Sequence, residues 1–231
     1  MRGYFALTSL YTSDLLLRQQ PILYSYYRGS SWRVRIVLAL KNVDYEYRAV
    51  NLRAEGGGEQ HSDDFKKINP MSQVPALVVD GQAISQSVAI MEYLNEKYPE
   101  PKLLPDDIIL RAKTRQIVEI IVSGVQPLQT PGLISRIGEA EWRNWAKFFI
   151  TKGFTAVETI LKTTAGKYCV GDNITLADAV LAPQLNNAQM HNIDMMQFPT
   201  IARVGEALEK VPAFQVSHPC RQKDTPSSQG I

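Results

Sequence analysis

The sequence predicts a small mixed α/β domain followed by an all-α domain. Strand-like and helical segments alternate before residue 99, and the segment 99–107 (PEPKLLPDD) then interrupts all periodicity with three prolines. Beyond this segment the sequence shows helical patterns and no convincing strand. We therefore assign residues 21–101 to the first domain and residues 108–220 to the second, a division that suits a chain of 231 residues.

The first domain begins with a strand, a helix and a second strand. Residues 22–25 (ILYS) form a β-branched and aromatic run, which favours a strand. Residues 32–41 (WRVRIVLALK) are so rich in apolar side chains that we expect a mostly buried helix. Residues 45–52 (YEYRAVNL) alternate in part and predict the second strand, and the three glycines at 56–58 indicate a mobile connection after it.

A hairpin and a second helix complete the first domain. Residues 76–79 (ALVV) and 83–84 are apolar, and Asp80-Gly81 between them is a strong turn signal, so two antiparallel strands are expected. Residues 86–97 place apolar side chains at helical spacing, which predicts an amphipathic helix.

The second domain is predicted to consist of helices over residues 108–125, 139–163, 175–190 and 201–210. Thr175 and Asp178 have the spacing of a capping box at the start of one of them. We therefore assign Asp178 to folding and not to catalysis. The tail at 221–231 is polar, contains Pro and Ser, and is predicted to be flexible.

Composition and charge exclude several classes of protein. Hydrophobic residues make up 45% of the chain and charged residues 21%, as in an ordinary globular protein. The formal net charge of +2 gives no excess for neutralising nucleic-acid phosphates or for coating an acidic membrane. No apolar run reaches about 18 residues, so no transmembrane helix is expected. Neither nucleic acid nor a membrane is an expected partner.

The cysteines and histidines form no metal-binding pattern. Cys169 and Cys220 have no CxxC neighbour, and the chain has 3 histidines, so we expect neither a metal site nor a disulfide framework. Two unpaired thiols suit a reducing, intracellular compartment, and a cytoplasmic location is the expectation.

Residues 1–20 are left out of both domains. They contain two arginines, several hydroxyl residues and a single acid, Asp14, which gives them a faint likeness to a mitochondrial transit peptide. We favour the simpler interpretation, a disordered N-terminal extension. If the segment acts as a transit peptide, the location would be mitochondrial.

Ser30 and Ser31 mark a first candidate binding position. They follow Gly29 and precede an apolar helical run, so they mark a helix N-terminus. Such a terminus offers unpaired N–H groups and the positive end of a macrodipole, which can hold an anion, including a thiolate. The simpler interpretation is that one of the serines is only an N-cap, worth about 1 kcal/mol.

Two further polar positions lie at Val74-Pro75 and Gln86-Ser87. Pro75 directly precedes a predicted strand, and a cis bond there would leave the N–H and C=O of Val74 free for an extended peptide. The simpler interpretation is an ordinary trans turn. Gln86 and Ser87 begin a predicted helix and can cradle a carboxylate, unless they serve only as caps. The three positions together suit the thiol, backbone and carboxylate of a short acidic peptide.

Six segments occur in an order that is typical of one family. They are SWRVRIVLALK (31–41), NPMSQVPALVVDG (69–81), QSVAIMEYLNEKYP (86–99), QPLQ (126–129), YCVGDNITLADA (168–179) and AFQVSHPCRQ (213–222). With them the chain resembles the glutathione transferases, and among these the zeta class, from about residue 21 to residue 223. The resemblance implies a thioredoxin-like N-terminal domain, an all-helical C-terminal domain, a homodimer, and glutathione as co-substrate.

The resemblance also implies roles for individual residues. Val74, before a cis Pro75, would bind the cysteinyl backbone of glutathione, and Gln86 with Ser87 would bind its γ-glutamyl end.

The remaining implied contacts involve the other parts of glutathione. Gln60 would reach its glycyl end or backbone, and Gln126 would reach the site from the second domain. Ser30 or Ser31 would hydrogen-bond the thiolate, and the sequence leaves open which of the two is in register.

The chain departs from the family pattern in its expected substrate pocket. Where the zeta class has a cysteine in an SSCSWR-like stretch, this chain has GSSWR. Met190 stands where the family usually has an arginine thought to hold the substrate's carboxylate, and Thr130 begins a second altered stretch. A methionine offers shape but no charge, so the pocket of Thr130 and Met190 is expected to favour an apolar substrate.

These observations lead to one main functional hypothesis and two alternatives. The main hypothesis is a zeta-type glutathione transferase that activates the thiolate for attack on small soft electrophiles, including displacement of halide from apolar xenobiotics in detoxification. The first alternative is isomerisation of maleylacetoacetate in tyrosine catabolism, with Arg33, Arg35 or Arg136 as the missing cation, although we expect all three to be solvated at the surface. The second is a non-catalytic ligand-binding protein, which the intact polar positions disfavour.

Overall fold

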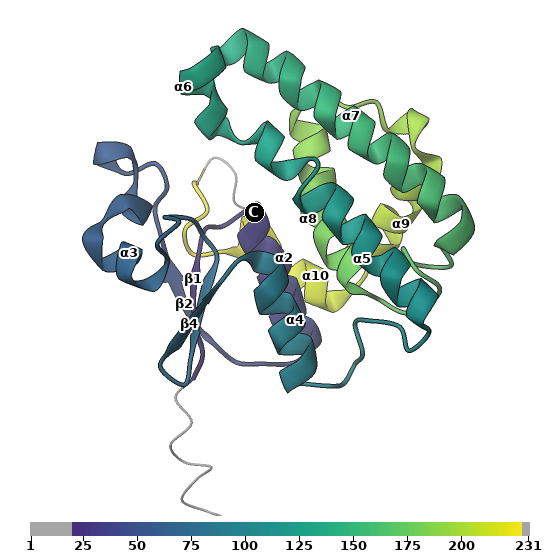
Figure 1. Cartoon of the computed structure of the whole chain (residues 1–231), viewed down its shortest axis with the longest axis horizontal. Helices are drawn as coiled ribbons and strands as arrows, with labels where there is room; N and C mark the ends of the chain where they lie inside the picture. Colours follow the sequence, from purple (N-terminus) through teal and green to yellow (C-terminus); the bar gives the residue numbers. More distant parts are fainter. Residues whose placement is uncertain (1–19, 228–231) are drawn as a thin grey trace, which may run out of the picture.

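The sheet of the first domain has four strands in the order β2-β1-β3-β4 (Figure 1). The computed structural model describes residues 20–227. Strand β1 (Ile22–Ser25) pairs in parallel with β2 (Glu46–Ala49) and antiparallel with β3 (Ala76–Val79), which pairs antiparallel with β4 (Gln82–Ser85). The predicted strands are confirmed, although β2 is shorter than predicted.

The turn between β3 and β4 has the conformation that its residues favour. Asp80 has φ 49° and Gly81 has φ 73°. Positive φ at both central positions is the hallmark of a type I′ turn, whose twist matches that of the two strands it joins.

Three helices complete the first domain. Helices α2 (Ser30–Leu40) and α4 (Ser87–Lys97) lie side by side between the sheet and the second domain, while α3 (Asp63–Ile68) lies at the other side of the sheet (Figure 1). Helix α3 was not predicted, because charged residues fill most of its length and leave no apolar stripe.

The second domain is helical, as predicted. Its helices are α5 (Ile108–Val122), α6 (Ile134–Ile137), α7 (Glu139–Thr164), α8 (Leu176–Met190), α9 (Pro199–Glu209) and α10 (Pro212–Val216). Helix α5 ends three residues before the predicted end at residue 125, and the short 3₁₀ segment η3 (Gln126–Gln129) follows it. The predicted capping box is confirmed, because Asp178 accepts hydrogen bonds from the N–H and hydroxyl of Thr175 at 2.8 and 2.9 Å.

Contacts around α2 and its end hold the two domains together. Helix α2 packs against α8, and Trp32 at its start donates to the Ser217 hydroxyl at 3.1 Å. Lys41 just after α2 donates to the carbonyls of Tyr98 and Pro101, which fixes the connection between the domains. One continuous apolar core therefore runs from the sheet into the helices.

The C-terminal segment contacts the first domain. The Tyr47 hydroxyl on β2 donates to the carboxylate of Asp224, a contact that the polar composition of the tail did not predict. Residues 1–19 and 228–231, which include most of the predicted N-terminal extension and the end of the predicted tail, lie outside the described residues.

Within residues 20–227 no single helix is long and apolar enough to cross a membrane, and one bent pair, Ile108–Gln129 with Pro131–Ile137, would qualify by length and composition alone. The same part of the chain contains no group of three or more His, Cys, Asp or Glu side chains placed to hold a metal ion.

Candidate active site

The first turn of α2 places two adjacent serines in different surroundings. Gly29 is the N-cap, with φ 71°, and no side chain caps the helix, which corrects the capping role considered for Ser30 or Ser31. Ser30 is partly exposed and donates its hydroxyl to the carbonyl of Val74 at 3.0 Å. Ser31 is completely buried, and its hydroxyl accepts the N–H of Tyr26 at 3.1 Å. Ser30 is therefore the serine that faces the loop before β3.

The start of α2 is suited to an anion. The N–H groups of a first helical turn have no partner within the helix, and no acidic residue lies in this one. A thiolate held there would have its pKa lowered by the helix dipole. The Ser30 hydroxyl has a single proton, which goes to Val74, so its donation to a thiolate requires the hydroxyl to rotate.

The loop before β3 offers two backbone groups of Val74 to a ligand, a free N–H and a carbonyl oxygen with one lone pair still unused. The Val74–Pro75 peptide bond is cis, as the resemblance implied. The Val74 carbonyl accepts the Ser30 hydroxyl and keeps a second lone pair, so it is less free than the sequence analysis expected. Its N–H donates to no acceptor among the described residues. An extended peptide can therefore pair with Val74 through both groups.

The start of α4 forms a second position for an anion. Gln86 is its N-cap, with φ 70°, and makes no capping hydrogen bond through its side chain. Ser87, the first helical residue, is 6% exposed, and its hydroxyl accepts a hydrogen bond from Arg33 at 3.2 Å. The first turn of α4 contains no acid, so its N–H groups remain available.

The prediction that Arg33 and Arg35 lie at the solvated surface is wrong. These two α2 side chains are only 2% and 1% exposed, because α4, α8 and α10 cover the helix. Arg136, in contrast, is exposed on α6.

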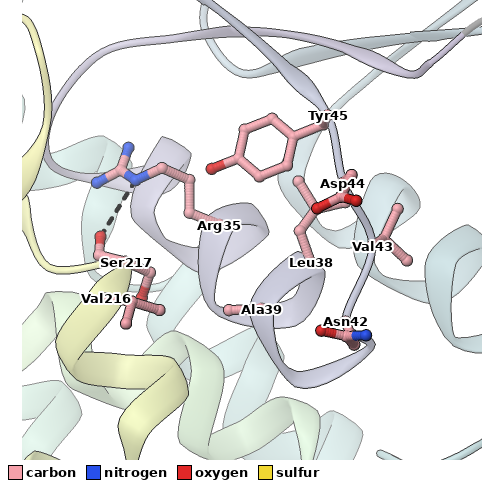
Figure 2. Close-up of a pocket in the computed structure, with 9 residues that line it drawn as sticks. All are labelled: Arg35, Leu38, Ala39, Asn42, Val43, Asp44, Tyr45, Val216 and Ser217. Carbon is pink, nitrogen blue, oxygen red and sulfur yellow. Dashed lines mark hydrogen bonds between the residues drawn. The ribbon is translucent and has the colours of Figure 1, made fainter.

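Arg35 has a structural role, because it hydrogen-bonds groups of the protein itself. Figure 2 shows its guanidinium turned toward Ser217, beside a hollow of about 220 Å³ between the end of α2 and α10. It donates to the carbonyls of Ser217, Tyr26 and Tyr27 and to the hydroxyl of Ser25. Four of the five N–H groups of the guanidinium are used in these hydrogen bonds, and the residue is 1% exposed, so it is not available to a substrate carboxylate.

Arg28 is the residue that the sequence analysis missed. It lies two positions before Ser30, and its Nη1 contacts the Met190 sulfur at 3.4 Å, across 162 positions of sequence. Its guanidinium also lies 5.4 Å from the centre of the Tyr27 ring. Among residues 20–227 it pairs with no carboxylate. Nothing in the local sequence signals this contact, because the two residues meet only where the domains meet.

Among the described residues, the predicted site residues Gln60, Gln126 and Thr130 form no hydrogen bond to the residues described above. Gln60 and Gln126 each bury a side-chain oxygen that has no partner among residues 20–227, although the Gln60 amide nitrogen donates to the Gly57 carbonyl at 2.9 Å. Thr130 is exposed at the end of η3. The structure thus joins Ser30 to Val74, and Met190 to Arg28, while within the described residues Gln60, Gln126 and Thr130 stay unconnected to them.

Comparisons with known proteins agree with this architecture. The chain matches the family model for the N-terminal domain of glutathione S-transferase over residues 29–97 and that for its C-terminal domain over residues 138–215. It is 53% identical to maleylacetoacetate isomerase of Rattus norvegicus over 209 residues, which is 90% of this chain and 96% of the rat protein.

Two solved structures are similar over nearly their whole length. One is maleylacetoacetate isomerase from Anaeromyxobacter dehalogenans with bound dicarboxyethyl glutathione and citrate, at 43% identity, a TM-score of 0.79, and coverage of 90% of this chain and 98% of that one. The other is a maleyl pyruvate isomerase described as a bacterial zeta-class glutathione S-transferase, at 37% identity, a TM-score of 0.84, and coverage of 89% and 100%.

A thioredoxin-like domain followed by a helical domain is the fold of the glutathione transferases, and the predicted fold is confirmed. The chain belongs to the glutathione S-transferase family, and within it to the zeta class.

The unpaired groups of the site fit the chemistry of glutathione. The free N–H of Val74 and the orphaned oxygens of Gln60 and Gln126 complement the carbonyl and N–H groups of a peptide. The helix starts at Ser30 and Ser87 complement its thiolate and a carboxylate.

Proposed function

We propose that the protein catalyses the glutathione-dependent cis–trans isomerisation of a small unsaturated dicarboxylate, with maleylacetoacetate as the favoured substrate. This is the first alternative of the sequence analysis, and relatives that carry the name of this isomerase support it over halide displacement. The case against isomerisation rested there on two departures from the family pattern, the missing cysteine beside the serines and Met190, which lacks the charge of the usual arginine.

The observation that carries the proposal is the position of Arg28. Its guanidinium touches the side chain of Met190, so a cation lies beside the position where the family usually has one. Arg28 has no carboxylate partner among residues 20–227. A guanidinium binds a carboxylate through two parallel hydrogen bonds, which would hold a dicarboxylate in register.

Different residues of the chain would bind different parts of glutathione. When bound, glutathione supplies a thiol for reversible addition to a conjugated carbon–carbon double bond. The Ser30 hydroxyl and the first turn of α2 would hold the thiolate, and Val74 would align the cysteinyl backbone. Ser87 would take the γ-glutamyl carboxylate, and the orphaned oxygens of Gln60 and Gln126 would accept N–H groups of the peptide.

Conjugation of apolar electrophiles is the second candidate function. Met190 is 51% exposed and presents apolar surface beside Arg28. Such a surface suits a soft electrophile without a carboxylate.

Paired kinetics on the purified protein with glutathione tests the proposal. We expect isomerisation of maleylacetone to be the faster activity, with chloride release or conjugation of apolar haloalkyl substrates slower. Conjugation or dechlorination without isomerisation would overturn the proposal in favour of the second candidate. Tight glutathione binding with neither activity would favour a non-catalytic protein.

The variant Arg28→Gln tests the role of the cation. We expect kcat/KM for maleylacetone to fall about 10- to 100-fold, as for loss of a charged hydrogen bond, with uncharged haloalkyl substrates affected less than about twofold. Adding Met190→Arg to this variant should restore much of the isomerisation. The exposed Arg203→Gln on α9 is the matched control. Equal losses for charged and uncharged substrates would contradict the assignment of Arg28.

A further inference from the structure

Arg33 is a buried cation without a counter-ion. It is 2% exposed, and among residues 20–227 it takes part in no ion pair. Burial alone lowers the pKa of its guanidinium to about 9, so the group still carries its charge at neutral pH. Within the described part of the chain its Nε has no hydrogen-bond partner. Buried charges are normally paired, so this one is an exception that needs a cause.

The hydrogen bond from Arg33 to Ser87 determines how the Ser87 hydroxyl can bond to a ligand. Its Nη1 donates to the Ser87 hydroxyl at 3.2 Å, and a guanidinium can only donate. The Ser87 oxygen is thus used as an acceptor, while its own proton goes to no acceptor among the described residues. That proton is free to be donated to a ligand at the start of α4.

The surroundings of Ser87 favour an anionic ligand. The first turn of α4, a helix of 11 residues, contains no acid, and its N–H groups have no partner within the helix. A donating hydroxyl, the helix dipole and the buried charge of Arg33 therefore act at one place, and each favours a carboxylate.

Arg33 also connects this place with the thiolate position. Ser30 and Arg33 are three residues apart on α2 and so share one helix face. Through this face, α2 contacts Val74 with one residue and Ser87 with the other. One face of α2 therefore contacts both the loop at the proposed thiolate position and the start of α4.

We propose that Arg33 is a positioning residue that makes the site select the α-carboxylate of the γ-glutamyl group of glutathione. It holds Ser87 as a donor toward that carboxylate and supplies the charge that the carboxylate neutralises. The inference rests on the proposed function, in which glutathione binds with its γ-glutamyl end at the start of α4.

The proposal is tested by measuring the affinities of two ligands by isothermal titration calorimetry. The ligands are S-methylglutathione and S-methyl-γ-aminobutyryl-cysteinylglycine, which lacks only the α-carboxylate. We expect the wild type to prefer the first by about 10- to 100-fold, the factor expected for a charged hydrogen bond. Arg33→Met should remove most of this preference, and Arg33→Lys should retain part of it because the charge remains.

Kinetics and a matched variant separate positioning from general damage. In Arg33→Met the KM for glutathione should rise by a similar factor, while kcat stays within about twofold because Ser30 is untouched. Arg203→Met, which removes an exposed arginine from α9, should leave the ligand preference unchanged. If Arg33→Met does not fold, Arg33→Lys supplies the test, because a preference equal to that of the wild type would overturn the role of Arg33.

The outcomes distinguish this inference from the proposed function. If the wild type binds neither ligand, the proposed function fails and the inference fails with it. If the wild type prefers S-methylglutathione and Arg33→Met keeps that preference, glutathione binding stands and the role of Arg33 is overturned.

Discussion

Helix α2 has two polar faces that contain the same residue types and differ in how completely their groups are paired. Ser31 and Arg35 share one face, four residues apart, and both are closed off by backbone groups of the neighbouring loops. Ser30 and Arg33 share the other face, three residues apart. There a guanidinium nitrogen is orphaned, and a hydroxyl contacts a loop that keeps a free N–H.

This difference shows how a structural polar group is told apart from a candidate functional one. Buried polar groups are almost always satisfied, so each exception needs a cause. On the Ser31–Arg35 face all recorded partners belong to the protein, so folding alone accounts for it. On the Ser30–Arg33 face the spare donors lie at two helix starts, where a ligand can complete them.

The largest expected effect is on stability, from Arg35→Met. The substitution leaves the buried carbonyls of Tyr26, Tyr27 and Ser217 without this donor. We expect the free energy of unfolding to fall by about 3 kcal/mol or more, which corresponds to a melting temperature lower by about 6–12 °C. Urea denaturation followed by circular dichroism measures it. Wild-type stability in this variant would mean that the Ser31–Arg35 face is not structural.

The two adjacent serines sharpen the comparison. Ser31→Ala removes the acceptor of the Tyr26 N–H and should lower the free energy of unfolding by about 1–2 kcal/mol, with kcat unchanged. Ser30→Ala should change stability by less than about 0.5 kcal/mol and lower kcat instead. Denaturation curves and maleylacetone kinetics on both variants decide the matter. A larger loss of kcat in Ser31→Ala would reverse the assignment of the faces.

The smallest expected effect is on the stability of Arg33→Met without ligand. Since the substitution removes an unpaired buried charge and one hydrogen bond, we expect the free energy of unfolding to stay the same or rise, by about 0–1 kcal/mol. Denaturation of the ligand-free variant, beside Arg35→Met, measures the contrast. Equal destabilisation of the two variants would remove the distinction between the faces.

Local chemistry explains what the sequence predicted well. The turn at Asp80-Gly81 and the capping box of Thr175 with Asp178 depend on residues at most three positions apart, so their pattern determines their geometry. Strand and helix order follows from periodicity in the same way. For the candidate site, the sequence marked Ser30 and Ser31 without deciding between them, and the family resemblance implied the cis bond before Pro75.

Only the tertiary structure decided which polar residues face which surroundings. The sequence predicted solvation for Arg33 and Arg35, but burial depends on α4, α8 and α10, which close over α2 only in the fold. The same holds for Arg28 and Met190, which meet across 162 positions. The amino-acid sequence by itself determined the strands and the longer helices, because their periodicity is local. The tertiary structure decided which charged side chains stay unpaired. Pairing depends on contacts between segments that lie far apart in the sequence, and no local pattern encodes such contacts.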